Sequence, residues 1–135
     1  MDMKGSCLCG QISFQLKSDP LFSALCHCKA CQKSSGSAFS FVIGVKKSDL
    51  QLEGTELKIY ECTGDSGSPA YRHFCANCGS IIYGQMKSQP DVVFLRAGLL
   101  DDLSGIKPKM NVYWRDHLPW LSDLTGIHSF DLMPG

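Results

Sequence analysis

The chain has 135 residues, which fits one ordinary domain over residues 1–135. Thirteen basic residues balance thirteen acidic ones, and Lys46-Lys47 is the only adjacent basic pair, so charge gives no case for binding nucleic acid or an anionic membrane. No apolar run approaches the ~20 residues of a membrane helix, and no leader-like segment precedes Cys7. We therefore expect a cytoplasmic protein, in which clustered cysteines indicate metal binding rather than disulfides.

Short β-strands dominate the pattern along the chain. Ile12, Phe14 and Leu16 alternate with polar residues, which is the period of a half-buried strand. Further β-prone runs, separated by turn-forming residues, lie at 39–45, 57–62, 81–83, 92–95 and 110–114. Helix signals are confined to one or two turns after Cys28 and another near Pro119. The sequence predicts a mainly β domain with short helical segments.

Seven of the eight cysteines stand in three groups with metal-ligand spacings: Cys7-x-Cys9, Cys26-x-Cys28-x2-Cys31 and Cys75-x2-Cys78. A C-x2-C turn brings two thiolates onto one ion, and Gly79 after the second cysteine tolerates the positive φ that such a turn needs. In an extended chain, residues i and i+2 point to the same face, so Cys7 and Cys9 could grip one ion from a strand end. Cys62 stands alone and is expected to be a packed or idle thiol.

Seven thiolates divide most naturally into four plus three, because four cysteines make a closed structural site and three leave a position for water or substrate. The two doublets and the triplet then give a closed and an open zinc site: Cys7, Cys9, Cys75 and Cys78; Cys26, Cys28 and Cys31. Spacing also permits a ribbon of Cys28/Cys31 with Cys75/Cys78, which leaves Cys7, Cys9 and Cys26 over.

The cysteines belong to a longer signature: Cys7-x-Cys9-Gly10, Cys26-x-Cys28-x2-Cys31-Gln32, Ser35-Gly36-Ser37 and Arg72-x-Phe74-Cys75-x2-Cys78-Gly79-Ser80. The tail adds Lys107-Pro108, Val112-Tyr113, Trp120 and Met133-Pro134. In this order the motifs resemble the glutathione-dependent formaldehyde-activating enzymes, whose domain is shared with centromere protein V. The resemblance covers nearly the whole chain. It departs at Asn111-Val112, where many relatives carry His-Ile.

The resemblance implies a β-tent, in which antiparallel sheets are held together by zinc, and two zinc ions per chain. It also favours one partition, since the family holds a structural zinc at the positions matching Cys7, Cys9, Cys75 and Cys78, and a catalytic zinc at those matching Cys26, Cys28 and Cys31. The implied activity is that of a carbon–sulfur lyase that adds a thiol such as glutathione to an aldehyde such as formaldehyde. Two alternatives stay open: a non-catalytic zinc module that binds a protein partner, and a related lyase with another thiol or electrophile.

Two histidines and one arginine near the cysteines each have two interpretations. His27 points away from its cysteine neighbours in an extended chain and is expected to be a surface or packing residue rather than a proton shuttle. His73 is either an ordinary half-buried strand residue or a group behind the metal ligands. Arg72 either holds a substrate carboxylate as a bidentate partner or is an exposed strand arginine.

Other polar and aromatic residues also have a structural and a functional interpretation. The segment Ser34–Ser37 could present donors beside the open zinc, or simply form the turn after the ligands. Trp114 and Trp120 are expected to pack in the core or a lid. Asp116-His117 has the composition of a catalytic dyad, but sequence adjacency alone gives it no supporting geometry.

Overall fold

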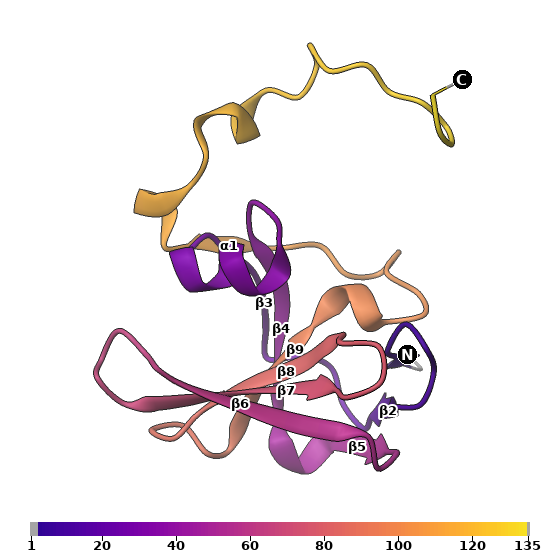
Figure 1. Cartoon of the computed structure of the whole chain (residues 1–135), viewed down its shortest axis with the longest axis vertical. Helices are drawn as coiled ribbons and strands as arrows, with labels where there is room; N and C mark the ends of the chain where they lie inside the picture. Colours follow the sequence, from indigo (N-terminus) through magenta and orange to yellow (C-terminus); the bar gives the residue numbers. More distant parts are fainter. Residues whose placement is uncertain (1–2, 135) are drawn as a thin grey trace.

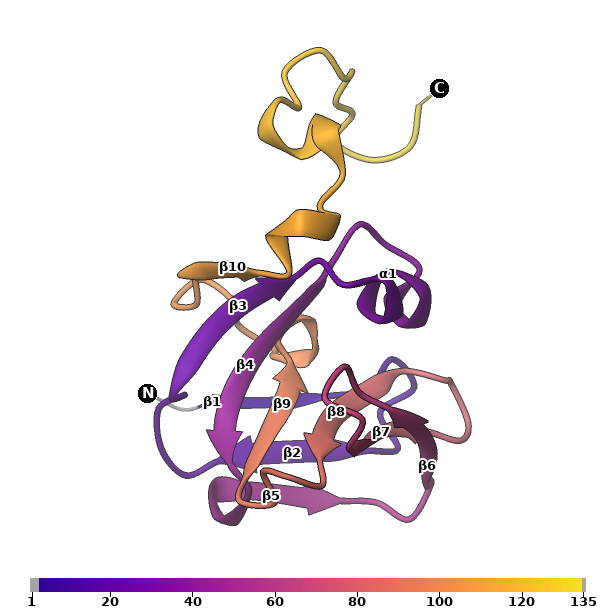
Figure 2. The ribbon, with the colours of Figure 1, turned by 90° about the vertical axis from the view of Figure 1, so that its left-hand side faces the viewer.

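The structure, a computed structural model, describes residues 3–134. Its strands form two sheets, and the strands of the smaller sheet cross those of the larger one (Figure 2). The smaller sheet is antiparallel with the order β1-β2-β5. It consists of β1 (Met3–Ser6), β2 (Ser13–Leu16) and β5 (Leu50–Glu53).

The larger sheet has seven strands in the order β10-β3-β4-β9-β8-β7-β6. All neighbours are antiparallel except β10 and β3, which are parallel. In chain order the strands are β3 (Phe22–Cys26), β4 (Ser40–Lys46), β6 (Leu57–Thr63), β7 (Pro69–Cys75), β8 (Ile81–Met86), β9 (Val92–Arg96) and β10 (Met110–Val112). The predicted mainly β architecture is confirmed.

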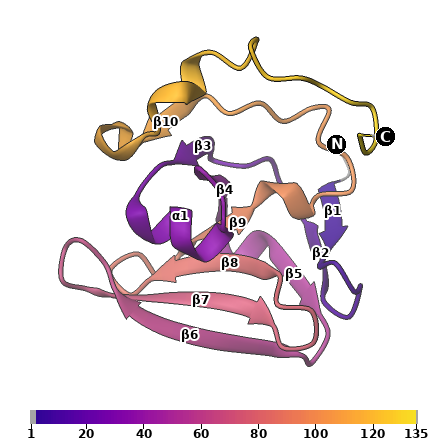
Figure 3. The same cartoon turned by 45° about the horizontal axis from the view of Figure 1, so that its top comes forward.

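Helical structure is limited to short pieces. α1 (Lys29–Ser35) follows β3, as predicted, and lies next to β4 (Figure 3). It ends at Gly36, whose φ of 62° is the left-handed conformation that glycine adopts without strain. The described residues also contain four 3₁₀ turns: η1 (Lys47–Asp49), η2 (Ala97–Leu99), η3 (Trp114–Asp116) and η4 (Pro119–Ser122). The predicted turn near Pro119 is the last of these.

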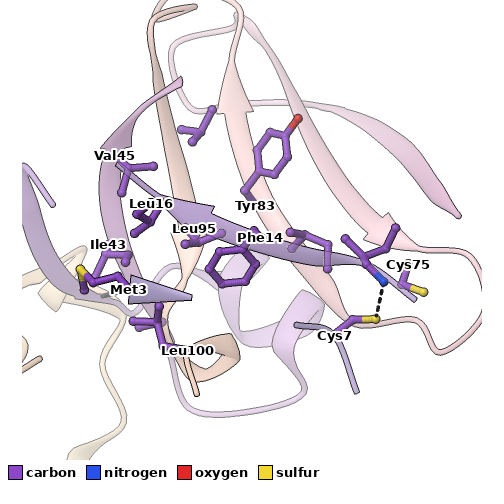
Figure 4. Packing of buried hydrophobic residues seen from close by; sticks show 14 residues of the cluster. Met3, Cys7, Phe14, Leu16, Ile43, Val45, Cys75, Tyr83, Leu95 and Leu100 are labelled. Atoms are coloured by element: carbon purple, nitrogen blue, oxygen red, sulfur yellow. Dashed lines mark hydrogen bonds between the residues drawn. The ribbon is translucent and has the colours of Figure 1, made fainter. Parts of the chain in front are cut away.

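The core lies between the two sheets (Figure 4). Ile12, Phe14 and Leu16 are buried, as the alternation predicted, and they meet the inward face of the larger sheet. Full burial of a large aliphatic or aromatic side chain contributes about 1.5–3 kcal/mol. Cys7 and Cys75 also belong to this buried cluster, so one candidate metal group starts at the edge of the core.

The predicted strand runs correspond to β2, β4, β6, β8, β9 and β10, whereas β1, β3, β5 and β7 were not predicted. β6 is an edge strand, and its residues Ile59 and Tyr60 are exposed. The chain after η4 runs away from the sheets (Figure 1). Trp120, within η4, is 51% exposed, so the expectation that it packs in the core or a lid is wrong. Within residues 3–134, none of the helices has the length and apolarity needed to cross a bilayer.

Candidate functional site

Four thiols, those of Cys7, Cys9, Cys75 and Cys78, lie within 4.8 Å of one another and could hold a metal ion. We call them the four-thiol group. The sulfurs of Cys7 and Cys9 are 3.6 Å apart, and those of Cys9 and Cys75 are 3.8 Å apart. Four sulfurs at about 2.3 Å from a central zinc ion in a tetrahedron would be about 3.8 Å apart. The spacing therefore fits a tetrahedral thiolate site.

Two turns build the four-thiol group, one after β1 and one after β7. Gly10 and Gly79 have φ values of 82° and 79°, so both glycines supply the left-handed conformation that the turns need. Cys7 and Cys9 lie at a strand end, as expected, but in a turn closed by the N–H of Gly10 on the Cys7 carbonyl rather than in extended chain. The N–H of Ile12 donates to the Cys7 sulfur at 3.3 Å (Figure 4).

Hydrogen bonds around the four-thiol group favour the thiolate at Cys78 and Cys9, whereas the pKa of Cys75 is raised to about 11. The Ser80 hydroxyl lies 3.3 Å from the Cys78 sulfur and lowers the pKa of Cys78 to about 5. A hydrogen bond with the side chain of Asn77 lowers the pKa of Cys9. The Ser80 hydroxyl also accepts from the N–H of Leu8, which links the two turns directly. Because metals bind the thiolate form, these contacts prepare the group for a cation.

Three thiols, those of Cys26, Cys28 and Cys31, form a second group within the same 4.8 Å limit, which we call the three-thiol group. Cys26 ends β3, Cys28 is the N-cap of α1, and Cys31 lies in its first turn. The Cys28 sulfur accepts the N–H of Cys31 at 3.2 Å, so the helix cap itself turns both thiols toward one point.

One thiolate is already favoured in the three-thiol group. Hydrogen bonding from the Cys26 thiol lowers the pKa of Cys31 to about 5, and the same bond, together with burial, raises the pKa of Cys26. The Arg96 guanidinium contributes to the lowered pKa of Cys31 through its charge. The group is therefore a set of soft donors in which negative charge is stabilised at one sulfur.

A cavity of about 650 Å³ borders the three-thiol group and contacts none of the four-thiol group. Its floor is the outward face of the larger sheet, including Phe22, Val42 and Phe94. A second cavity, of about 720 Å³, lies over the smaller sheet and has no cysteine in its lining. The two thiol groups thus differ in access to a space that could hold a small molecule.

The histidines do not reach the cavity. His27 is 1% exposed; its Nε2 lies 2.9 Å from the Asn111 Oδ1, and the Phe39 and Trp114 rings pack edge-on against it. The expected packing role is confirmed and the surface alternative is wrong, because the segment after β3 turns this side chain inward. His73 is also buried and is stacked on Tyr83 at 4.0 Å, and burial lowers the pKa of His73.

The remaining predicted residues divide between structural roles and the cavity. Ser35 donates to the Cys31 carbonyl at 2.6 Å within α1, which favours the turn-forming role for this segment. Asp116 pairs with Arg115 at 3.6 Å, whereas the His117 ring contacts the Trp114 carbonyl, so no Asp116-His117 dyad forms. Trp114 stacks on His117 but is 44% exposed, so it packs against its neighbours without lying in the core.

Three polar residues line the cavity in positions that residue spacing did not reveal. Arg72 reaches it from β7 and is half-buried, so it is not an exposed strand arginine. Arg96 reaches it from β9. The alternation of Arg96 with the apolar Val93 and Leu95 is a sequence signal that could have predicted its position on the opposite face of the sheet. Cys62 is not idle, because its sulfur accepts an N–H of Arg72 at 2.8 Å.

Comparison with known proteins adds family information to this geometry. The sequence model of the family described as "Glutathione-dependent formaldehyde-activating enzyme" matches residues 2–116. A Halomonas elongata protein named "Putative glutathione-dependent formaldehyde-activating enzyme" is 30% identical over 105 residues, which cover 75% of this chain and 67% of that protein. A Fusarium vanettenii protein of the same name is 23% identical over 87 residues, covering 64% of this chain and 46% of that protein.

A similar fold occurs in a solved structure. The crystal structure of a Rhodobacter sphaeroides protein matches with a TM-score of 0.59 at 23% sequence identity. The match covers 81% of this chain and 98% of the other. At this identity the likeness supports the fold alone.

Proposed function

The chain belongs to the glutathione-dependent formaldehyde-activating enzyme family, and on that premise we propose that it is a zinc-dependent carbon–sulfur lyase that adds a thiol to an aldehyde. From the family name, the proposed substrates are glutathione and formaldehyde. The observation that carries the proposal is the unequal setting of the two thiol groups: the three-thiol group borders the cavity of about 650 Å³ and the four-thiol group does not. Three protein ligands leave a coordination position for a substrate, whereas four do not.

In this proposal the four-thiol group holds a structural zinc. Its ligands would be Cys7 and Cys9 from the turn after β1, Cys75 from the end of β7 and Cys78 from the turn that follows it. These turns belong to different sheets, so a metal shared between them would fasten the smaller sheet to the larger one. Such a site contributes to folding directly, because it does not exist in the unfolded chain.

The three-thiol group would hold the second zinc, which would supply a position where a substrate sulfur is bound as a thiolate. With a zinc ion bound, the three thiolates would give the three-thiol group a net charge of about −1. Arg96, close enough for its charge to lower the pKa of Cys31, balances that charge from the cavity floor. Phe22 and Phe94 make part of the cavity floor apolar.

The overall reaction balances without an oxidant or reductant. A bond forms between the thiol sulfur and the aldehyde carbon while the carbonyl π bond breaks. The proton lost by the thiol ends on the former carbonyl oxygen, giving a hydroxyl. With glutathione and formaldehyde the product is S-(hydroxymethyl)glutathione. The role of the chain is to hold the sulfur deprotonated beside the carbonyl carbon, since proximity and orientation lower the barrier.

Metal analysis and an exchange assay together test the proposal. Protein purified without chelators should contain two zinc ions per chain. Cys28→Ser should lose one of them and keep its fold, and Cys62→Ser, a matched cysteine outside both groups, should keep both. Thiol–aldehyde exchange measured by NMR, with the uncatalysed rate subtracted, should be accelerated by the native protein and not by Cys28→Ser.

Two results would overturn the proposal. Retained exchange in Cys28→Ser would show that the three-thiol group is not the reaction site. One zinc ion or none per native chain would refute the two-site assignment. Absence of acceleration with several thiols, in protein that holds both ions, would instead support a non-catalytic zinc module that binds a protein partner.

A further inference from the structure

The cavity floor is organised in rows of residues that face each other across neighbouring strands. In one row, Arg72 of β7 pairs with Gly84 of β8, and Gly84 pairs with Phe94 of β9. The row continues through Gly44 of β4 to Phe22 of β3. Because residues paired across antiparallel strands share one face of the sheet, all five face the cavity side.

Side-chain size varies sharply along this row. The Phe22 ring covers Gly44 and contacts Phe94, with ring centroids 5.8 Å apart. At Gly84 nothing fills the corresponding space: a Cβ atom built there would meet only the Tyr71 carbonyl oxygen, at 3.8 Å. The floor therefore has an apolar half around the two phenylalanines and an open position between Phe94 and Arg72.

Within the described residues, the charge of Arg72 has no carboxylate partner. Both ion pairs found within residues 3–134 are made by Arg115, with Asp65 and Asp116. Arg72 donates one N–H to the Cys62 sulfur at 2.8 Å, which orients the guanidinium and leaves most of its donors for another acceptor. The other unpaired cavity arginine, Arg96, lies close enough to the three-thiol group for their charges to interact.

The lining as a whole has an excess of positive charge. Lys29, Arg72, Arg96 and Arg115 outnumber the carboxylates of Asp65 and Asp116 by two. With a zinc ion bound, the three-thiol group has a charge of about −1, which offsets only one of the two excess positive charges. A half-buried guanidinium in a largely apolar cavity is costly unless an anion pairs with it. The missing anion is best supplied by the ligand.

We propose that Arg72 is a specificity-determining residue that binds a carboxylate of the thiol substrate, so that the site selects thiols that carry an acid group. The sulfur would lie at the three-thiol group, and the chain linking it to the carboxylate would cross the open position above Gly84. The thiol identity rests on the proposed function. A planar guanidinium suits this role because it pairs with a carboxylate through two parallel hydrogen bonds.

The test compares the binding of glutathione and of its diethyl ester to the zinc-loaded protein by isothermal titration calorimetry. The two ligands share the same thiol and differ in their carboxylates, so the ratio of their affinities isolates acid recognition. The native protein should bind the acid at least tenfold more tightly. Arg72→Met should weaken acid binding by about tenfold to a hundredfold, as expected for a lost charged hydrogen-bond pair, and leave ester binding nearly unchanged.

Two further variants control the interpretation. Arg115→Met removes a cavity arginine that is already paired, and it should keep the native acid-to-ester ratio. Arg72→Lys keeps the charge without the bidentate geometry. It should fold as Arg72→Met does and should retain part of the preference for the acid over the ester. An unchanged ratio in Arg72→Met would overturn the proposal, as would an equal loss for acid and ester.

The outcome is separable from that of the proposed function. If the acid preference depends on Arg72 but no aldehyde addition is accelerated, only the lyase proposal fails. If addition is accelerated and the preference does not depend on Arg72, only the assignment of this arginine fails.

Discussion

A metal in the four-thiol group would close a much longer loop of chain than one in the three-thiol group, so removing each should have unequal effects on stability. Cys9 and Cys75 are 66 residues apart in sequence, whereas Cys26 and Cys31 are five apart. By the chain-entropy relation for a cross-link, closing a 66-residue loop around a metal costs the unfolded chain about 4 kcal/mol and closing a five-residue loop about 2 kcal/mol, so the unfolded chain binds a metal less readily at the four-thiol group.

Paired serine variants test this difference. Cys9→Ser with Cys78→Ser removes the two less deeply buried members of the four-thiol group, so little core packing is lost. Cys28→Ser with Cys31→Ser is the matched pair, and serine can still cap α1. Urea unfolding of the proteins purified with zinc should show a loss that is larger by about 2 kcal/mol for the first pair than for the second. Equal losses, or a larger loss for the second pair, would refute the assignment of the structural role.

Three further predictions concern the cavity floor and the thiolates. A Cβ at Gly44 would lie 2.1 Å from the Phe22 ring, so Gly44→Ala should displace that ring and cost about 1–3 kcal/mol in urea unfolding; a neutral effect would show that the ring has room to move. Gly84→Val meets no such obstacle and should fold normally. By narrowing the cavity it should raise KM for glutathione about tenfold, which corresponds to a loss of about 1.4 kcal/mol of binding contacts. An unchanged KM would place the substrate elsewhere. Because the pKa of Cys78 falls from 9.0 to about 5 on folding, the stability it contributes to the metal-free protein is complete above about pH 9 and is lost as the pH falls through about 5. Ser80→Ala should move that titration, followed by thiolate absorbance, to higher pH, and an unmoved titration would exclude the hydroxyl as its cause.

Features that depend on a few neighbouring residues could be predicted from the sequence. The turn at Cys75–Gly79, the α1 cap at Cys28 and the strand at 13–16 all follow from local spacing. The turn and the cap are stabilised by contacts within about five residues, and the alternation of residues 12–16 marks the buried face of its strand, so the necessary information lies in one short segment. β7 was missed because it begins with proline and mixes polar and apolar residues on both faces.

Long-range strand pairing decided the rest. The sequence by itself determined which cysteines can act as local doublets or as a triplet, because a tight turn or a helix cap sets those distances. Whether Cys75 and Cys78 join Cys7 and Cys9 or Cys28 and Cys31 depends on which strand ends meet, and only the tertiary structure groups them with the former. The same holds for Arg72 and Arg96, since a residue's neighbours across a sheet come from the register of strands distant in sequence. Spacing thus determined which cysteines can act as metal ligands. The packing of the two sheets decided which thiols gather at the edge of the core and which border the cavity.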